Sequence, residues 1–135
     1  MAARTVPDTH RDILEAATAV LATNSANGLP HVTAVAFLHD KADDLVKISL
    51  NDTRQKTKNL RRDPSATVFI FDPANPYRTL EIRGRAELLP DPDFEFARIA
   101  GAKYDDDFHR HDRPGETRSV LIVHPLRVVA THLTS

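Results

Sequence analysis

Cysteine is absent from this chain of 135 residues, and so is tryptophan. The lack of cysteine excludes disulfide bonds, thiolate nucleophiles and thiolate metal sites, and it suits a reducing compartment. Aromatic residues make up only 6% of the sequence, so surfaces for stacking nucleic-acid bases are scarce. Charge of one sign is not in excess either. The formal net charge is -1, which argues against nucleic-acid binding through bulk charge.

Long hydrophobic runs are missing too. The longest apolar stretches, such as residues 120–123, are far shorter than a membrane span. Residues 1–12 contain no apolar run of signal-peptide length. We therefore expect a cytoplasmic protein with no membrane contact. The length predicts one domain over residues 1–135, because a chain of this size can close one hydrophobic core and is short for two.

Hydropathy patterning predicts a mainly β fold with short helices. Strands are expected at residues 18–23, 31–39, 45–50, 66–71 and 79–86, and in two strands over 118–133 that are kinked at Pro125. Asn27-Gly28 is a strong hairpin signal, and short turns should join the first three strands into an antiparallel meander. Gly84, inside a strand of strict alternation, indicates a bulge or a close approach of backbones.

Three helices are expected between these strands. The first opens near Pro7 with Asp8 as its N-cap and turns Ile13 and Leu14 inward. A second covers residues 53–62, where Asp52 and Gln55 stand at capping-box spacing, and a third covers 93–104. This order of elements suits a small antiparallel barrel with helices at its ends.

The helix at residues 53–62 carries the clearest functional signal. It holds five basic residues and no acidic one; they are Arg54, Lys56, Lys58, Arg61 and Arg62. A helix that starts directly after a strand presents free N–H groups and a positive dipole end, which suit phosphate. Arg54 and Lys56 would stand at the mouth of such a site. The alternative is an ordinary solvated surface helix.

Sequence motifs in and around this helix are similar to those of a known superfamily. Residues 49–64 read S-L-N-D-T-R-Q-K-T-K-N-L-R-R-D-P and contain the pattern R-x-K-x-x-N-L-x-x-x-P. A G-x-P triplet occupies residues 28–30, and an aromatic residue followed by E-x-x-G-x-A-E-L-L lies within residues 77–89. Over residues 18–89, with a weaker echo in the last two strands, the chain resembles the deazaflavin-dependent branch of the pyridoxamine 5′-phosphate oxidase-like (PPOX class) superfamily.

The resemblance implies an antiparallel split β-barrel, like that of FMN-binding proteins, which forms a homodimer with a cofactor groove at the interface. Arg54 and Lys56 would bind the phosphate region of the cofactor. The resemblance also implies that Ser49 and Asn59 are supporting polar contacts. The strand beside the tricyclic ring would be formed by His31, Val32, Thr33 and Ala34. Tyr77 would border the same groove from the partner subunit.

The function implied is that of an oxidoreductase that transfers a hydride between coenzyme F420 and a small conjugated organic molecule. No catalytic acid is nominated. One alternative is an FMN-binding protein of the same fold, and another is a non-enzymatic protein that binds F420 or a tetrapyrrole such as haem. The fuller FMN-binding and substrate-phosphate pattern of true pyridoxamine phosphate oxidases is not found, so oxidation of vitamin B6 is not expected.

Residues 104–116 are charged and turn-rich and predict a loop. The run His109-Arg110-His111-Asp112 contains residue types that ligate metals. Histidines two residues apart share a face only in a strand, however, so a solvated loop is the preferred interpretation and no metal site is predicted. The loop could act as a lid over the groove. His31 and His39 are expected on the same face of one strand, with His31 toward bound ligand.

Overall fold

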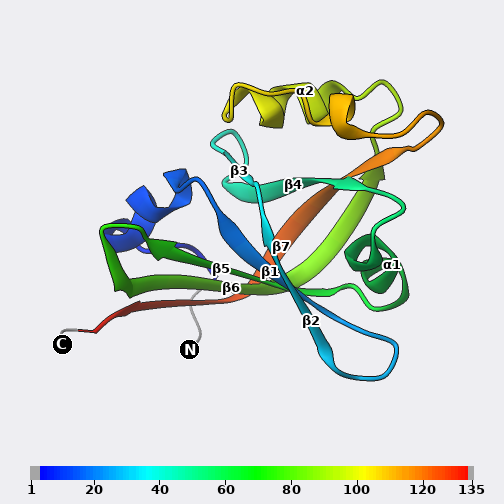
Figure 1. Cartoon of the computed structure of the whole chain (residues 1–135). Coiled ribbons are helices and arrows are strands. Elements are labelled where there is room, and N and C mark those ends of the chain that lie inside the picture. Colours follow the sequence, from blue (N-terminus) through cyan, green and yellow to red (C-terminus); the bar gives the residue numbers. More distant parts are fainter. Residues whose placement is uncertain (1–3, 134–135) are drawn as a thin grey trace.

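One antiparallel sheet dominates the structure. The computed structural model describes residues 4–133. Seven strands pair in the order β2-β1-β5-β6-β7-β4-β3, and Figure 1 shows that the sheet curls strongly and carries helices at its margins. The predicted mainly β, antiparallel architecture is confirmed. The strands are β1 (Ala19–Asn24), β2 (Pro30–Val35), β3 (Leu38–Asp40), β4 (Leu45–Asn51), β5 (Ser65–Asp72), β6 (Asn75–Pro90) and β7 (Arg118–His132).

Within residues 4–133, four short helical segments accompany the sheet. They are the 3-10 helices η1 (Asp8–Glu15) and η2 (Phe108–His111) and the α-helices α1 (Gln55–Arg62) and α2 (Glu95–Ala102). Ile13 and Leu14 of η1 are buried as predicted, but Pro7 rather than Asp8 is its N-cap residue. Residues 104–116 are not all loop, since η2 lies within them. None of the helices in residues 4–133 has the length and apolar character needed to cross a bilayer.

The core lies on the concave face of the sheet and follows from strand alternation. Leu80 and Ile82 of β6, which strict alternation puts on one face, are buried, and other strands contribute Leu21, Ile48, Val68, Ile70, Leu121 and Val123. Each large apolar side chain buried in this way stabilises the fold by roughly 1.5–3 kcal/mol.

Gly84 occupies the same face of β6, where the backbone of β7 approaches closely. A Cβ atom at this position would lie 2.5 Å from the carbonyl oxygen of His124. The pairing of β6 with β7 shifts register between Arg83 and Gly84, opposite Pro125. This shift accommodates the proline, so residues 118–132 form one continuous strand rather than the two that were predicted. The close approach predicted at Gly84 is confirmed.

Residues 31–39 do not form the single strand that the sequence predicts. β2 ends at Val35, and β3 begins at Leu38 at the opposite end of the strand order. The predicted meander is therefore wrong: β2 pairs with β1, whereas β3 pairs with β4. For the same reason His31 and His39 lie on different strands, where they stand opposite the buried residues Thr23 of β1 and Val46 of β4.

Phe37 fixes the crossover between these two edges of the sheet. Its side chain is fully buried, and its N–H donates to the hydroxyl of Tyr104 at 2.9 Å. Its carbonyl oxygen accepts from the ammonium of Lys103 at 2.9 Å. The hydroxyl of Tyr104 also donates to the carbonyl oxygen of Ala17 at 2.7 Å. Side chains that follow α2 thus satisfy the backbone at a point where no ladder can do so.

α1 begins without the predicted capping box. Arg54 is its N-cap residue, and no side chain caps the helix. Asp52 instead turns to β7, where it accepts a hydrogen bond from the hydroxyl of Ser119 at 2.7 Å. It also pairs with Arg61 at 3.2 Å. These contacts hold α1 against the neighbouring ends of β4 and β7, which places its basic residues beside the site described next.

Candidate cofactor-binding site

A cavity of about 190 Å³ lies where the end of β2, the middle of β4, the start of α1 and η2 meet. Small and apolar side chains share its lining with cations and one hydroxyl group. The lining residues are Ala34, Val35, Ala36, Ile48, Ser49, Leu50, Lys56, Phe108, His111 and Arg118. Three of the residues predicted for a cofactor site, Ala34, Ser49 and Lys56, are therefore brought together. These three residues lie together because the segment that connects β2 to β3 passes beside β4.

Lys56 is a half-buried cation in this cavity. Burial lowers the pKa of Lys56, and the charges of Arg54 and Arg118 lower it further. No acidic group of residues 4–133 counters these effects. A partly desolvated cation without a protein counter-ion is costly, and this arrangement favours an anionic ligand.

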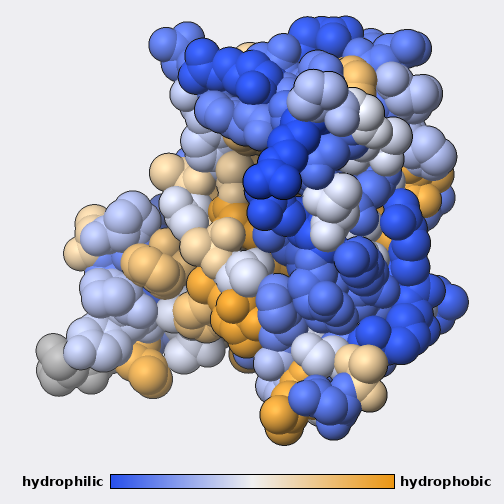
Figure 2. Space-filling model, turned by 45° about the vertical axis from the view of Figure 1, so that its right-hand side comes forward, coloured by the Kyte–Doolittle hydropathy of each residue, from blue (hydrophilic) through white to orange (hydrophobic). Residues whose placement is uncertain are grey.

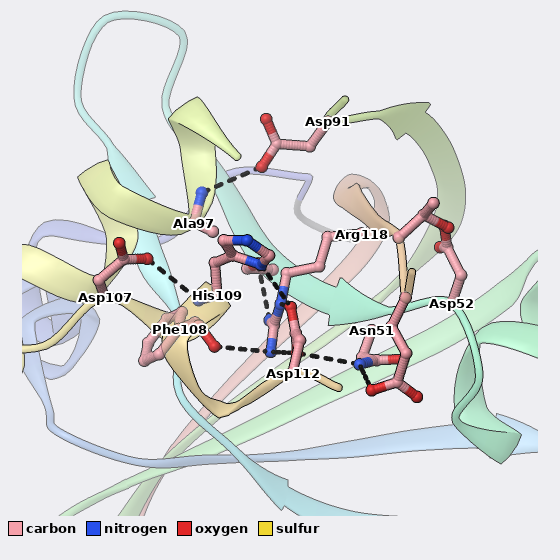
Figure 3. A network of polar contacts seen from close by, with 12 residues as sticks. Asn51, Asp52, Asp91, Ala97, Asp107, Phe108, His109, Asp112 and Arg118 are labelled. Carbon is pink, nitrogen blue, oxygen red and sulfur yellow. Dashed lines mark hydrogen bonds and ion pairs between the residues drawn. The ribbon is translucent and has the colours of Figure 1, made fainter. Parts of the chain in front are cut away.

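Arg118 was not predicted, although it is the second partly buried cation of the cavity. Its Nη1 donates to the hydroxyl oxygen of Ser49 at 3.1 Å, and its Nη2 donates to the carbonyl oxygen of Phe108 at 3.1 Å. Nε and Nη2 each donate to Asp112 at 2.8 Å, in a bidentate pair visible in Figure 3. Because the oxygen of Ser49 accepts from Arg118, its hydroxyl proton is left for another acceptor, such as a ligand.

Asp112 holds Arg118 in this orientation. Its side chain is only 2% exposed, and it also accepts from Asn51 at 2.9 Å and contacts His109 at 3.1 Å. Burial alone would raise the pKa of Asp112, but the hydrogen bonds from Arg118, His109 and Asn51 outweigh it and lower the pKa to about 2. The carboxylate therefore stays ionised at neutral pH and keeps the guanidinium at the cavity wall.

The histidines of residues 104–116 belong to this polar network. The ring of His109 stacks on Phe94, with centroids 3.4 Å apart, and its Nδ1 faces Asp112 (Figure 3). His111 pairs with Asp106 at 2.8 Å. The two imidazoles thus pair with different carboxylates. Within residues 4–133, no group of three or more metal-ligating side chains lies close enough together to hold a metal ion. The segment is tied to the rest of the fold more extensively than a solvated loop would be.

Two predicted residues of the basic helix lie outside the cavity lining. Arg54 is exposed at the N-cap of α1, next in the chain to the cavity. Asn59 is fully buried beneath the helix, where its amide donates to the hydroxyl of Thr23 at 3.1 Å and its carbonyl oxygen accepts from Gln55 at 2.9 Å. Asn59 thus tethers α1 to β1 in this structure.

The predicted residues of β2 occupy both faces of a strand at the edge of the sheet. Val32 is 60% exposed on the outer face. His31 and Thr33 face the other way, and within residues 4–133 the buried Nδ1 of His31 and the buried hydroxyl of Thr33 have no hydrogen-bond partner. Tyr77 is 56% exposed at the start of β6 and does not line the cavity of its own chain.

Comparison with known proteins shows which family shares this fold. The family described as pyridoxamine 5′-phosphate oxidase matches residues 6–132. A solved structure of an F420 reductase is 30% identical, with a TM-score of 0.79, over 92% of this chain and 98% of that one. A putative pyridoxamine 5′-phosphate oxidase from Listeria innocua is 28% identical, with a TM-score of 0.69, over 91% and 95%.

A conserved hypothetical protein from Mycobacterium tuberculosis is 21% identical, with a TM-score of 0.76, over 96% of this chain and 88% of that one; this likeness concerns the fold alone. The predicted antiparallel split β-barrel is confirmed by these matches together with the curled seven-stranded sheet. The chain belongs to the pyridoxamine 5′-phosphate oxidase family of split β-barrel oxidoreductases.

Proposed function

We propose that this chain binds the deazaflavin coenzyme F420 and acts as an F420-dependent reductase in the cytoplasm. The observation that carries the proposal is the cavity at the start of α1, where half-buried Lys56 lies without a carboxylate of residues 4–133 beside it. Arg118 adds a second positive charge at the same wall. The likeness to an F420 reductase at 30% identity supports deazaflavin over other anionic ligands.

The chemistry of the donor set fits a planar cofactor with an anionic tail. Lys56, Arg118 and the hydroxyl of Ser49 supply donors for phosphate or carboxylate oxygens, with exposed Arg54 next to them. Small residues at 34 and 36 leave room beside β2 for a flat ring.

Bound F420 would supply the hydride for a small conjugated molecule, and the protein would supply position and electrostatics. Lys56 and Arg118 would hold the anionic end of the cofactor, while Asp112 keeps the guanidinium from turning away. Ala34 and Val35 would form the wall beside its ring. Phe108 of η2 would border the ligand as another part of the cavity lining. No proton donor is required for binding itself.

We further propose that the binding groove is completed in a homodimer. A cavity of about 190 Å³ is smaller than the roughly 300–1,000 Å³ typical of sites for ligands of this size. The outer face of the sheet exposes Val32, Phe71, Tyr77 and Leu133, and Figure 2 shows hydrophobic side chains gathered beside a hydrophilic surface. A second copy packed on this face would bury them and bring its own Tyr77 toward the groove.

Titration of the purified protein with F420 and with FMN, followed by ligand fluorescence, tests the proposal. Replacing Lys56 or Arg54 with Ala should weaken F420 binding by roughly 1–3 kcal/mol, or about 5- to 150-fold in Kd, because each removes a charge-assisted contact. Lys41→Ala is the matched control, since it removes the same charge from a residue that is 81% exposed and lies outside the cavity. Affinity unchanged in Lys56→Ala would remove this cavity from consideration.

The same titration separates the alternative functions. Tight binding of FMN with no binding of F420 would favour an FMN-dependent oxidase of this family. Binding of F420 without oxidation of its reduced form by any conjugated acceptor would favour a non-enzymatic carrier, and preference for haem would indicate a tetrapyrrole-binding protein. Turnover of pyridoxamine 5′-phosphate, which we do not expect, would identify a vitamin B6 oxidase.

A further inference from the structure

His111 is the titratable side chain of the cavity that the proposed function leaves without a role. It is the last residue of η2 and lines the cavity with Lys56, Ser49 and Arg118. Its Nε2 lies 2.8 Å from Asp106, and the side chain is 57% exposed. The imidazole therefore touches the ligand space on one side and solvent on the other, so it can exchange protons while a ligand is bound.

Asp106 fixes the orientation of this imidazole ring. Its carboxylate accepts hydrogen bonds from His111 and from the N–H of Asp107, and Arg110 lies 2.6 Å away. The hydrogen bond to His111 lowers the pKa of Asp106, and the backbone bond and Arg110 lower it further. An ionised carboxylate only accepts, so Nε2 must carry a proton. Nδ1 is then the nitrogen that has a lone pair available to accept a proton.

We propose that His111, oriented by Asp106, is a ligand-binding residue of this cavity, and that binding of an anionic planar cofactor is coupled to protonation of its imidazole. The inference rests on the proposed function and assigns it a pH-dependent binding residue. Protonated His111 is a third cation beside Lys56 and Arg118, and it adds a donor that neutral imidazole lacks at Nδ1.

The charges around His111 determine the sign of the coupling. On its own segment the ring contacts the carboxylate of Asp106, which also pairs with Arg110. From α1 and β7 the ring faces two further cations, Lys56 and Arg118, of which Arg118 is paired with Asp112. An anion bound between these cations offsets their repulsion of a charged imidazole. Binding therefore promotes protonation of His111, and by linkage the affinity must fall as pH rises.

The test measures the Kd for F420 between about pH 5.5 and pH 8.5 in wild type, His111→Gln and His124→Gln. His124 is the control because it is also a half-exposed histidine paired with a carboxylate, that of Glu87, but lies outside the cavity. We expect wild type and His124→Gln to bind up to about tenfold more weakly per pH unit over part of this range. His111→Gln should lack that component, so its Kd should approach that of wild type at the alkaline end.

Calorimetry in two buffers of different ionisation enthalpy gives a readout that does not depend on turnover. Because groups of F420 also titrate, the quantity to compare is the difference in proton uptake between wild type and His111→Gln. Wild type should take up more protons per bound F420 than His111→Gln at about pH 7.

The outcomes separate this inference from the function on which it rests. If F420 binds to wild type but the pH dependence and proton uptake of His111→Gln match those of wild type, the role of His111 is wrong and the cofactor assignment stands. If neither F420 nor FMN binds to wild type, both proposals are overturned. If His124→Gln loses the pH dependence to the same extent as His111→Gln, the effect is not specific to the cavity and the inference fails.

Discussion

Replacing Asp112 with Asn tests whether the bidentate pair with Arg118 organises the site. The substitution keeps the shape of the side chain but removes its charge from a position that is 2% exposed, beside a guanidinium that is 11% exposed. Arg118 would keep as acceptors Ser49, the carbonyl oxygen of Phe108 and the one amide oxygen of the new side chain, but it would lose its counter-ion. Breaking a buried ion pair from one side costs about 3–5 kcal/mol. Because Arg118 borders a cavity that water can enter, we expect a cost somewhat below that range, about 2–3 kcal/mol.

The assay is urea denaturation of wild type and Asp112→Asn at several pH values. The pKa of Asp112 is held at about 2, below the ordinary value of roughly 3.9 for aspartate. The stabilisation from its charge is therefore fully present above about pH 4 and is lost as pH falls toward 2. The difference in unfolding free energy between the two proteins should be largest near neutral pH and shrink steadily below about pH 4.

Asp93→Asn serves as the matched control, because Asp93 is exposed and makes no side-chain hydrogen bond or ion pair with residues 4–133. Its unfolding free energy should stay within about 0.5 kcal/mol of wild type. Two results would refute the reasoning: Asp112→Asn as stable as the control at neutral pH, or a stability difference that does not diminish in acid.

Two further substitutions test how the fold builds the site. Gly84→Ala should destabilise the protein by roughly 1–3 kcal/mol in urea denaturation, because a Cβ would lie 2.5 Å from the carbonyl oxygen of His124; stability equal to wild type would show that β7 can shift. Tyr104→Phe should cost roughly 1–3 kcal/mol and lower Tm, since it leaves the N–H of Phe37 and the carbonyl of Ala17 without their hydroxyl partner; an unchanged Tm would mean that water replaces it.

Features that depend on residues close together in the sequence were predicted correctly. Alternation places Leu80 and Ile82 in the core because side chains of a strand point to opposite faces regardless of its partners. Gly84 was identified as a close approach because a residue without Cβ inside such a strand has few other uses. The basic helix was also placed correctly, and Lys56 lies in a cavity that its local charge pattern suggested.

Features that depend on distant partners were not predicted. Residues 31–39 look like one strand because nothing local marks the change of sheet edge at Phe37; its partners, Lys103 and Tyr104, lie more than sixty residues away. The capping box failed for a similar reason. Asp52 has the right spacing to Gln55, but Ser119 of β7 offers it a closer partner. Spacing shows which contacts are available, whereas packing decides which are made.

Arg118 shows why only part of the site could be predicted from the sequence. A lone arginine at the head of an apolar strand carries a weak signal, and its counter-ion Asp112 lies in a segment that reads as solvated loop. Yet that pair joins residues 104–116 to Ser49, so the segment cannot move freely without releasing a cation from the cavity wall. Residues 104–116 are therefore better understood as one wall of the proposed groove than as a detached lid. It follows that substitutions in η2 should change ligand affinity as well as access.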